Sequence, residues 1–204
     1  MYVIIEGMPG TGKTSTAKAL AKRLTAQYMK SAFPATELGW LMQSVHDSGK
    51  IKESELLYLA SAHADELKIH RLLAQGLSVV KDKSLFTSIA HLKVNGYANK
   101  NESVVECVDG MYMQLIELSC EPDLVVFLST DLKTVQERAK YKTDVSQLDE
   151  RLFSNPEVYL NQERMIKQLL EEKYRKKILY INAFSSDCET IVDKIIETLT
   201  DKKE

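Results

Sequence analysis

The sequence has few of the features on which disulfide-bonded and membrane-spanning proteins depend. Its 204 residues include only three cysteines, which are odd in number and far apart: Cys107, Cys120 and Cys188. We therefore expect free thiols, a cytoplasmic location and no zinc site. No apolar stretch approaches the roughly 20 residues that a transmembrane helix needs. We expect no signal peptide either, because Glu6 and a glycine-rich turn interrupt the first apolar run.

The chain also has almost no net charge. The 27 lysines and arginines and the 29 aspartates and glutamates sum to −2 at pH 7. A near-neutral chain has no general electrostatic attraction to nucleic acid or to a membrane surface, so neither is expected as a partner. The length and the 44 % share of hydrophobic residues predict a single globular domain over residues 1–204.

Short apolar segments alternate with helical patterns along the chain. This alternation is typical of an α/β fold with a mostly parallel sheet. The expected strands are 2–5, 77–81, 123–128 and 177–181, with a short additional strand at 30–33. One helix is expected directly after the loop at 7–14, and two more over 53–75 and 84–97. A fourth is expected after the capping residues 129–131. Two further helices are expected to begin at capping boxes, formed by Ser154 with Glu157 and by Ser186 with Glu189.

The segment Gly7-Met-Pro-Gly-Thr-Gly-Lys-Thr14 matches the pattern G-x-x-x-x-G-K-T of a phosphate-binding loop. Its glycines allow backbone N–H groups to turn inward around an anion, and the next helix adds the positive end of its dipole. The segment follows a strand and precedes an amphipathic helix, as this loop requires. We therefore predict that it binds a nucleoside triphosphate. The expected ligand-binding residues here are Gly7, Gly10, Thr11, Gly12, Lys13, Thr14 and Ser15.

Three side chains have the chemistry needed for phosphoryl transfer with Mg²⁺. Lys13 can neutralise the outer phosphates, and the Thr14 hydroxyl can ligate the metal. Asp82 stands at the carboxyl end of the second apolar segment, the edge at which ligands approach an open parallel sheet. We predict that Thr14 and Asp82 hold the metal, with Asp82 ordering its bound water.

The polar stretch 140–154 separates two expected helices ahead of the last strand. A lid in this position would exclude water, so that the phosphoryl group reaches an acceptor and is not lost to hydrolysis. Arg151 is the best candidate for a lid cation. Arg138, Lys140 and Lys142 are the other nearby positive charges that can stabilise the transferring group.

Two segments carry a specific family resemblance. The opening IIEGMPGTGKT resembles F-E-G-x-D-G-x-G-K-S/T, and VVKDKSLFTSIAH resembles V-x-x-D-R-Y-x-x-S-x-x-A-Y-Q. Both patterns belong to the thymidylate kinase branch of the P-loop nucleoside-monophosphate kinases. Weaker matches extend the resemblance over nearly the whole chain: FPATELG, LLYLASAHADEL, PDLVVFLSTDLKTVQERAK and LYINA.

The resemblance implies a three-layer P-loop kinase fold, in which helices flank a mostly parallel five-stranded sheet and a short lid covers the site. It also implies transfer from ATP, with Mg²⁺, to a nucleoside or deoxynucleoside monophosphate, and a possible homodimer. Arg138 and Ala183 would then lie beside the adenine of ATP.

The acceptor half departs from the family pattern. Pro9 replaces a carboxylate, Ala62 replaces an arginine that faces the base, and Leu92 replaces a glutamine that reads thymine. Lys83 replaces an arginine that grips the acceptor phosphate, which keeps the positive charge but loses the two-pronged grip. The resemblance therefore leaves the identity of the acceptor open.

Two alternatives remain from the sequence. Asp82-Lys-Ser84 also resembles the E/D-R-S of deoxynucleoside kinases, which place a carboxylate base and a tryptophan in the region of Glu37 and Trp40. The altered acceptor half is also compatible with a nucleotide-binding regulatory protein that transfers nothing. Turnover separates the regulator from the kinases, and acceptor preference separates the two kinases.

Overall fold

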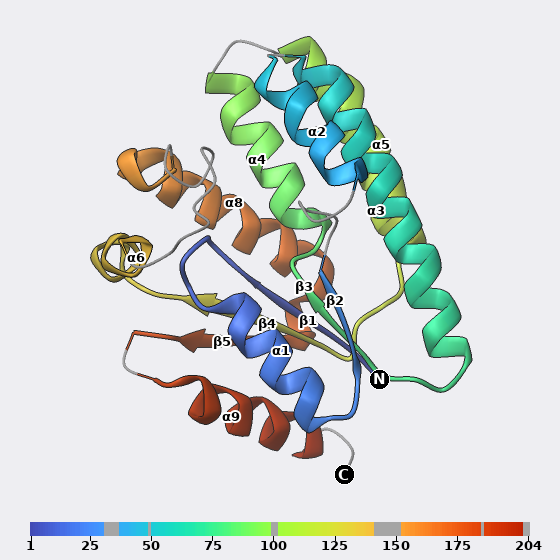
Figure 1. Cartoon of the computed structure of the whole chain (residues 1–204), viewed down its shortest axis with the longest axis vertical. Helices are drawn as coiled ribbons and strands as arrows, with labels where there is room; N and C mark the ends of the chain where they lie inside the picture. Colours follow the sequence, from blue (N-terminus) through green and yellow to red (C-terminus); the bar gives the residue numbers. More distant parts are fainter. Residues whose placement is uncertain (31–36, 49, 99–101, 141–151, 185, 202–204) are drawn as a thin grey trace.

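The computed structural model describes residues 1–204 apart from 31–36, 49, 99–101, 141–151, 185 and 202–204. Its centre is a five-stranded parallel sheet with the order β2-β3-β1-β4-β5 (Figure 1). The strands are β1 (Tyr2–Gly7), β2 (Gln27–Lys30), β3 (Val79–Asp82), β4 (Leu124–Ser129) and β5 (Ile178–Asn182). The predicted α/β class and parallel sheet are confirmed.

Helices cover both faces of the sheet and complete three layers. One apolar core joins alternate strand residues to α1 (Lys13–Arg23) and α9 (Cys188–Asp201). The other core lies under four helices: α3 (Ile51–Ala74), α4 (Leu85–Ala98), α5 (Glu102–Leu118) and α8 (Pro156–Tyr174). The strands read as nearly continuous apolar runs because both of their faces are covered.

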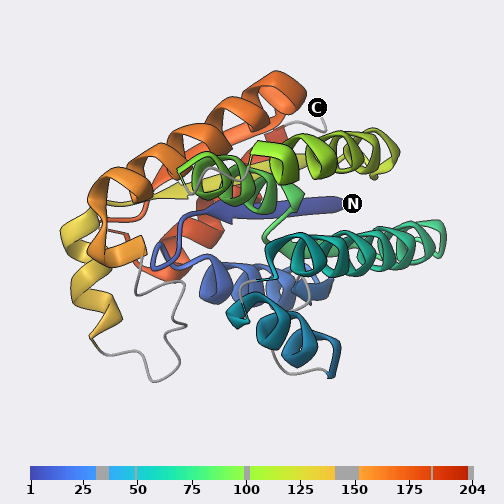
Figure 2. The same cartoon turned by 90° about the horizontal axis from the view of Figure 1, so that it is seen from above.

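The remaining helices lie outside these layers. Helix α2 (Glu37–Asp47) packs against α3, so that α3 lies between α2 and α5 (Figure 2). Helix α6 (Leu132–Ala139) follows β4, and the short 3-10 helix η1 (Arg175–Lys177) leads into β5. Within the described ranges, no helix combines the length and apolar character needed to cross a bilayer.

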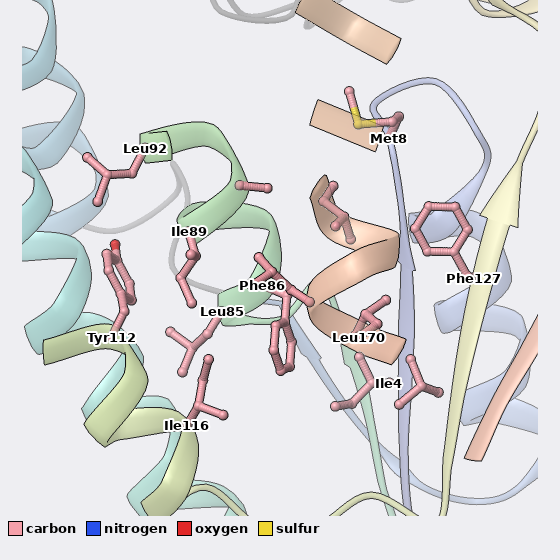
Figure 3. Packing of buried hydrophobic residues seen from close by; sticks show 14 of the residues in the cluster. Ile4, Met8, Leu85, Phe86, Ile89, Leu92, Tyr112, Ile116, Phe127 and Leu170 are labelled. Carbon is pink, nitrogen blue, oxygen red and sulfur yellow. The ribbon is translucent and has the colours of Figure 1, made fainter. Parts of the chain in front are cut away.

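The larger core connects the sheet to the helices that extend beyond its carboxyl edge. Ile4 and Phe127 come from the sheet, and Leu170 comes from α8 (Figure 3). Further from the sheet, Leu92 of α4 and Tyr112 of α5 belong to the same cluster. This continuity fixes α4 and α5 relative to the sheet.

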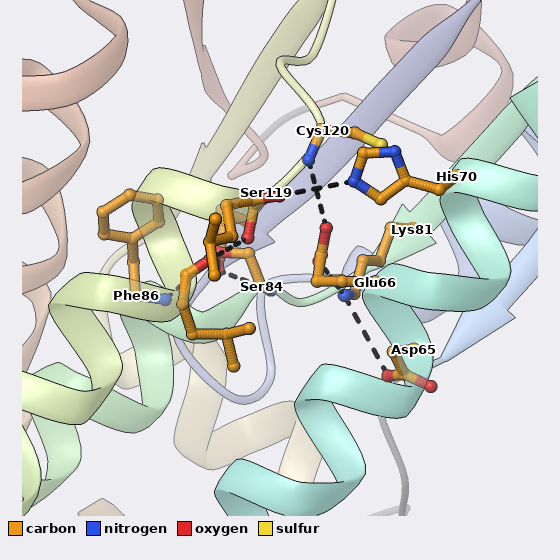
Figure 4. A network of polar contacts seen from close by, with 11 residues as sticks. Asp65, Glu66, His70, Lys81, Ser84, Phe86, Ser119 and Cys120 are labelled. Atoms are coloured by element: carbon orange, nitrogen blue, oxygen red, sulfur yellow. Dashed lines mark hydrogen bonds and ion pairs between the residues drawn. The ribbon is translucent and has the colours of Figure 1, made fainter.

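A buried ion pair fixes α3 to the same face of the sheet. Lys81 of β3 is 1 % exposed, and its Nζ lies 2.9 Å from Oε1 of Glu66 and 4.0 Å from Oδ2 of Asp65 (Figure 4). The other oxygen of Glu66 accepts the backbone N–H of Cys120 at 3.3 Å. Such a buried pair adds little net stability, but removing either side chain would leave the other charge buried without a partner.

Several predicted boundaries are wrong, for local reasons. The short strand predicted at 30–33 is β2, which begins at Gln27 directly after a tight turn in which Thr25 has a φ of 50°; residues 31–33 lie outside the described part. Asn155, and not Ser154, caps α8, because Pro156 takes the first helical position. Asp187, and not Ser186, accepts the Thr190 N–H at the start of α9.

Candidate active site

The phosphate loop connects β1 to α1 through two glycines that no other residue can replace without strain. Gly7 has a φ of 137°, and a Cβ atom there would lie 2.2 Å from the Leu128 carbonyl oxygen of β4. Gly10 has a φ of 85°, and its Cβ atom would lie 2.6 Å from Val135 of α6. The loop is therefore pressed between β4 and α6, and only glycine combines this space with positive φ.

Internal hydrogen bonds hold the loop in its curved form. The Thr11 hydroxyl donates to the Met8 carbonyl at 2.9 Å, and Lys13 Nζ donates to the same oxygen at 2.7 Å. Gly12 precedes the first turn of α1, in which Ser15 is exposed. The loop thus brings the predicted phosphate-binding residues together at the positive end of a helix dipole.

Thr14 and Asp82 meet across the carboxyl edge of the sheet. The Thr14 hydroxyl donates to Asp82 Oδ2 at 2.7 Å, and the Tyr28 hydroxyl of β2 donates to the same atom at 3.1 Å. Burial, together with the negative charge of Asp82, raises the pKa of Tyr28 above its ordinary value, so its hydroxyl remains a donor. Asp82 is 2 % exposed.

This pair suits a magnesium ion. A hydroxyl and a carboxylate are the hard oxygen donors that Mg²⁺ prefers, and this ion usually takes one or two protein ligands and completes its shell with phosphates and water. The predicted pair therefore has the right chemistry beside the phosphate loop. Tyr28 was not predicted, because no motif marks a tyrosine on the neighbouring strand.

Arg138 connects the loop to the end of β5. Its Nη1 donates to the Gly10 carbonyl at 3.3 Å, and its Nη2 donates to the Ala183 carbonyl at 3.0 Å. A cavity of about 460 Å³ opens between α6 and the segment after β5. Its lining consists of Asp131, Lys133, Thr134, Glu137, Asn182 and Phe184. The two residues predicted beside the adenine, Arg138 and Ala183, are thus in contact with each other at this end of the site.

Glu6 is a residue of the site that the sequence did not single out. Its fully buried carboxylate accepts the Gly7 N–H at 3.1 Å, the Ser84 N–H at 2.7 Å, the Ser84 hydroxyl at 2.5 Å and the Thr87 hydroxyl at 2.7 Å. A negative charge at the start of α4 is also stabilised by the helix dipole. Glu6 therefore joins the phosphate loop to α4. The sequence feature that could have identified Glu6 is a charged residue near the end of an otherwise apolar strand.

Lys83 occupies a strained turn between β3 and α4. Its φ is 75°, a conformation that costs a non-glycine residue about 1–2 kcal/mol. Its backbone N–H donates to the Ile5 carbonyl at 3.0 Å, which fixes the turn on β1. The predicted acceptor-binding lysine therefore directly follows Asp82, at the edge of the sheet where the phosphate loop also lies.

The remaining predicted residues either lie outside the described part of the chain or are exposed elsewhere. Arg151 and Lys142 lie outside the described residues, with most of the expected lid, and Lys140 is exposed immediately after α6. Glu37 and Trp40, which the deoxynucleoside kinase alternative invoked, are both exposed on α2. Trp40 in particular is 62 % exposed.

The parallel sheet, the glycine loop and the Thr14–Asp82 pair together define a P-loop phosphotransferase. The model of the family described as thymidylate kinase matches residues 5–195. The chain belongs to the thymidylate kinase family and is a kinase.

Two curated relatives illustrate the similarity in sequence. A probable thymidylate kinase from Pyrococcus abyssi is 27 % identical over 91 % of this chain and 89 % of the relative. A probable thymidylate kinase from Methanocaldococcus jannaschii is 28 % identical over 70 % of this chain and 71 % of the relative.

Solved structures agree in fold. Thymidylate kinase from Candida albicans aligns with a TM-score of 0.76 at 18 % identity, over 99 % of this chain and 92 % of that one. Deoxyadenosine kinase from M. mycoides also gives 0.76 at 18 % identity, over 98 % of this chain and all of the other. At this identity the two structures support the fold and do not separate one acceptor from another.

Proposed function

We propose that this kinase transfers the γ-phosphoryl group of ATP, with Mg²⁺, to the phosphate of a nucleoside or deoxynucleoside monophosphate. The Thr14–Asp82 hydrogen bond beside the phosphate loop carries the proposal, since it joins two magnesium-type ligands at the point where the outer phosphates would lie. Membership of the thymidylate kinase family supports the nucleotide acceptor.

Each part of the site has a role in this proposal. The loop residues Gly7 to Ser15 hold the phosphates, and Lys13 neutralises the charge that develops on the transferring group. Thr14 and Asp82 would hold Mg²⁺, which would supply positive charge against that of the phosphates. Arg138 and Ala183 lie beside the adenine. Phe184, which lines the cavity beside them, would form the edge of the adenine site.

The acceptor needs little chemical help. A phosphate oxygen is already a nucleophile, so positioning and charge neutralisation provide most of the catalysis. Lys83 is proposed to bind the acceptor phosphate. Arg151 is proposed as the cation of a lid over residues 140–154, which excludes water from the transfer.

We also propose that residues 1–204 form one domain and that two copies associate. Exposed leucines on α3 support the second part, with exposed apolar residues on the neighbouring α2. They are Leu56 (41 %), Leu67 (45 %), Trp40 (62 %) and Leu41 (51 %). Sedimentation equilibrium tests this part: a monomer at every concentration would contradict it.

The test of the transfer reaction is ATP consumption with Mg²⁺ against all ribo- and deoxynucleoside monophosphates and nucleosides, with products resolved. Lys13→Ala is the negative control, and Lys22→Ala, exposed in the last turn of the same helix, is the matched control. Transfer to a monophosphate that Lys13→Ala abolishes supports the proposal. Transfer to nucleosides alone indicates a deoxynucleoside kinase, and ATP binding without any transfer indicates a regulatory protein.

A further inference from the structure

Glu55 is a buried carboxyl that has no part in the phosphate chemistry proposed above. It lies on α3 and is 4 % exposed. Tyr112 of α5, which is fully buried, donates its hydroxyl to Glu55 Oε2 at 2.9 Å. Tyr112 belongs to the same apolar cluster as Ile89 and Leu92 of α4 (Figure 3). A glutamate is rarely buried unless a partner or a ligand requires it.

The position of Glu55 connects it to the acceptor side of the site. The positive charge of Lys83 is close enough to act on the Glu55 carboxyl. Lys83 in turn follows Asp82, which is bonded to Thr14 of the phosphate loop. Glu55 therefore lies near the residue proposed to bind the acceptor phosphate.

We propose that Glu55 reads the base of the acceptor and selects bases that carry an exocyclic amino group over thymine and uracil. This inference rests on the proposed function, because it assumes a nucleotide acceptor. A carboxylate only accepts hydrogen bonds, and the amino groups of cytosine, adenine and guanine donate them. Thymine and uracil carry an acceptor at each corresponding position, O4 opposite the amino group of cytosine or adenine and O2 opposite that of guanine, and an ionised carboxylate repels both.

The surroundings of Glu55 favour the same choice. Ala62 and Leu92 belong to the same apolar cluster as Tyr112, and their side chains carry no donor for O4 of thymine. Ligand sites are typically apolar with a few placed polar groups that fix orientation, and Glu55 with the Tyr112 hydroxyl has this character.

The protonation state of Glu55 is compatible with this role. Burial raises the pKa of Glu55 to about 7, whereas the Tyr112 hydroxyl and the Lys83 charge favour the ionised form. An amino group of a bound base is a further donor, so binding would lower the pKa again. The comparison of bases is therefore made near pH 8, where the carboxyl is ionised.

The first readout is equilibrium binding by calorimetry at about pH 8, with dCMP, dAMP and dGMP compared with dTMP and dUMP. We expect the unaltered protein to bind at least one amino-bearing nucleotide about tenfold or more tightly than dTMP, the usual range for one base-specific contact. Glu55→Gln should reduce this preference about tenfold, because a carboxamide offers a donor to O4. Glu53→Gln, exposed on the same helix, should leave it unchanged.

Tyr112→Phe is the second variant, since it keeps the ring and removes only the hydroxyl that orients Glu55. A smaller preference with retained binding is expected. Three outcomes overturn the inference. The unaltered protein binds dTMP more tightly than the amino-bearing nucleotides, Glu55→Gln lowers the affinity for all five nucleotides equally, or none of the five binds.

The transfer assay with the same nucleotides separates this inference from the proposed function. A Glu55-dependent binding preference without any phosphoryl transfer supports the role of Glu55 and contradicts the kinase reaction on monophosphates. Transfer to dTMP that Glu55→Gln does not alter supports the kinase reaction on monophosphates and contradicts the role of Glu55.

Discussion

The Thr14 hydroxyl donates to Asp82 Oδ2 at 2.7 Å, which joins the first turn of α1 to the last residue of β3. The two residues are 68 positions apart in the sequence, and the parallel pairing of β1 with β3 brings them together. One hydrogen bond therefore connects the phosphate loop to β3, the strand that leads into α4.

Asp82→Asn is expected to lower kcat and to raise the Mg²⁺ concentration at half-maximal rate. The amide keeps an oxygen for Thr14 but loses the negative charge that favours the cation, and losses of about 10- to 100-fold are typical when such a partner is changed. Steady-state rates over a magnesium titration measure this. Tyr28→Phe removes the other hydrogen bond to Asp82 and should change the magnesium dependence little; equal effects of both variants would contradict a metal-specific role.

Arg138→Lys is expected to raise the KM for ATP about tenfold. The guanidinium reaches the carbonyls of Gly10 and Ala183 at once, whereas an ammonium group on a shorter, unforked side chain cannot span both. One lost hydrogen bond to a charged donor corresponds to about 1.5 kcal/mol, which is close to tenfold. Initial-rate kinetics against ATP test this, with Lys194→Arg on the exposed side of α9 as control. An unchanged KM would show that Arg138 does not contribute to ATP binding.

Glu6→Gln is expected to destabilise the fold by about 2–4 kcal/mol. The carboxylate accepts four hydrogen bonds in a fully buried position, and the amide replaces one acceptor oxygen by a donor that faces other donors. Urea unfolding followed by circular dichroism measures the change. Glu197→Gln on the exposed side of α9 is the control and should lie within about 0.5 kcal/mol of the unaltered protein.

Lys81→Met is expected to cost about 3–5 kcal/mol, because it leaves the carboxylate of Glu66 buried without its cation. Adding Glu66→Leu should recover much of this loss, since an apolar pair needs no compensation. The free energies of unfolding of the two single variants and the double variant form the required cycle. Additive losses in the double variant would show that the two side chains are not coupled.

The pH dependence of stability should contain a contribution from Glu55. Its carboxyl holds a proton more tightly in the folded chain, with a pKa of about 7, than in the unfolded chain, with a pKa near 4.5. The free energy of unfolding therefore falls as the pH rises from the unfolded-state pKa to the folded-state pKa. Relative to Glu55→Gln, the unaltered protein should lose roughly 3 kcal/mol of unfolding free energy between about pH 4 and about pH 8. Parallel curves for the two proteins would contradict the raised pKa.

The phosphate loop could be predicted from the sequence because its residues are contiguous and its chemistry depends on the backbone. Gly7, Gly10 and Gly12 fix the curve locally, and the flanking strand and helix are adjacent in the chain. Asp82 could be placed because a strand end is visible as the end of an apolar run.

The rest of the site depends on partners that are distant in the sequence. Glu6 lies within a quoted motif, yet its role requires Ser84 and Thr87, which only the pairing of β1 with β3 brings near. Tyr112 lies on α5, which was not predicted, although buried residues recur there at helical spacing. The contact between Glu55 and Tyr112 spans 57 positions, and no local pattern encodes it.

Neighbouring polar residues in β3 also carry alignment information for folding. Lys81 faces the carboxylates of Glu66 and Asp65, and Asp82 faces the opposite side, towards Thr14. A strand that slipped by one position would turn Asp82 towards those two carboxylates and Lys81 away from them. Mispaired sheets would therefore bury like charges together, so the two polar residues of this otherwise apolar strand disfavour a misfolded sheet.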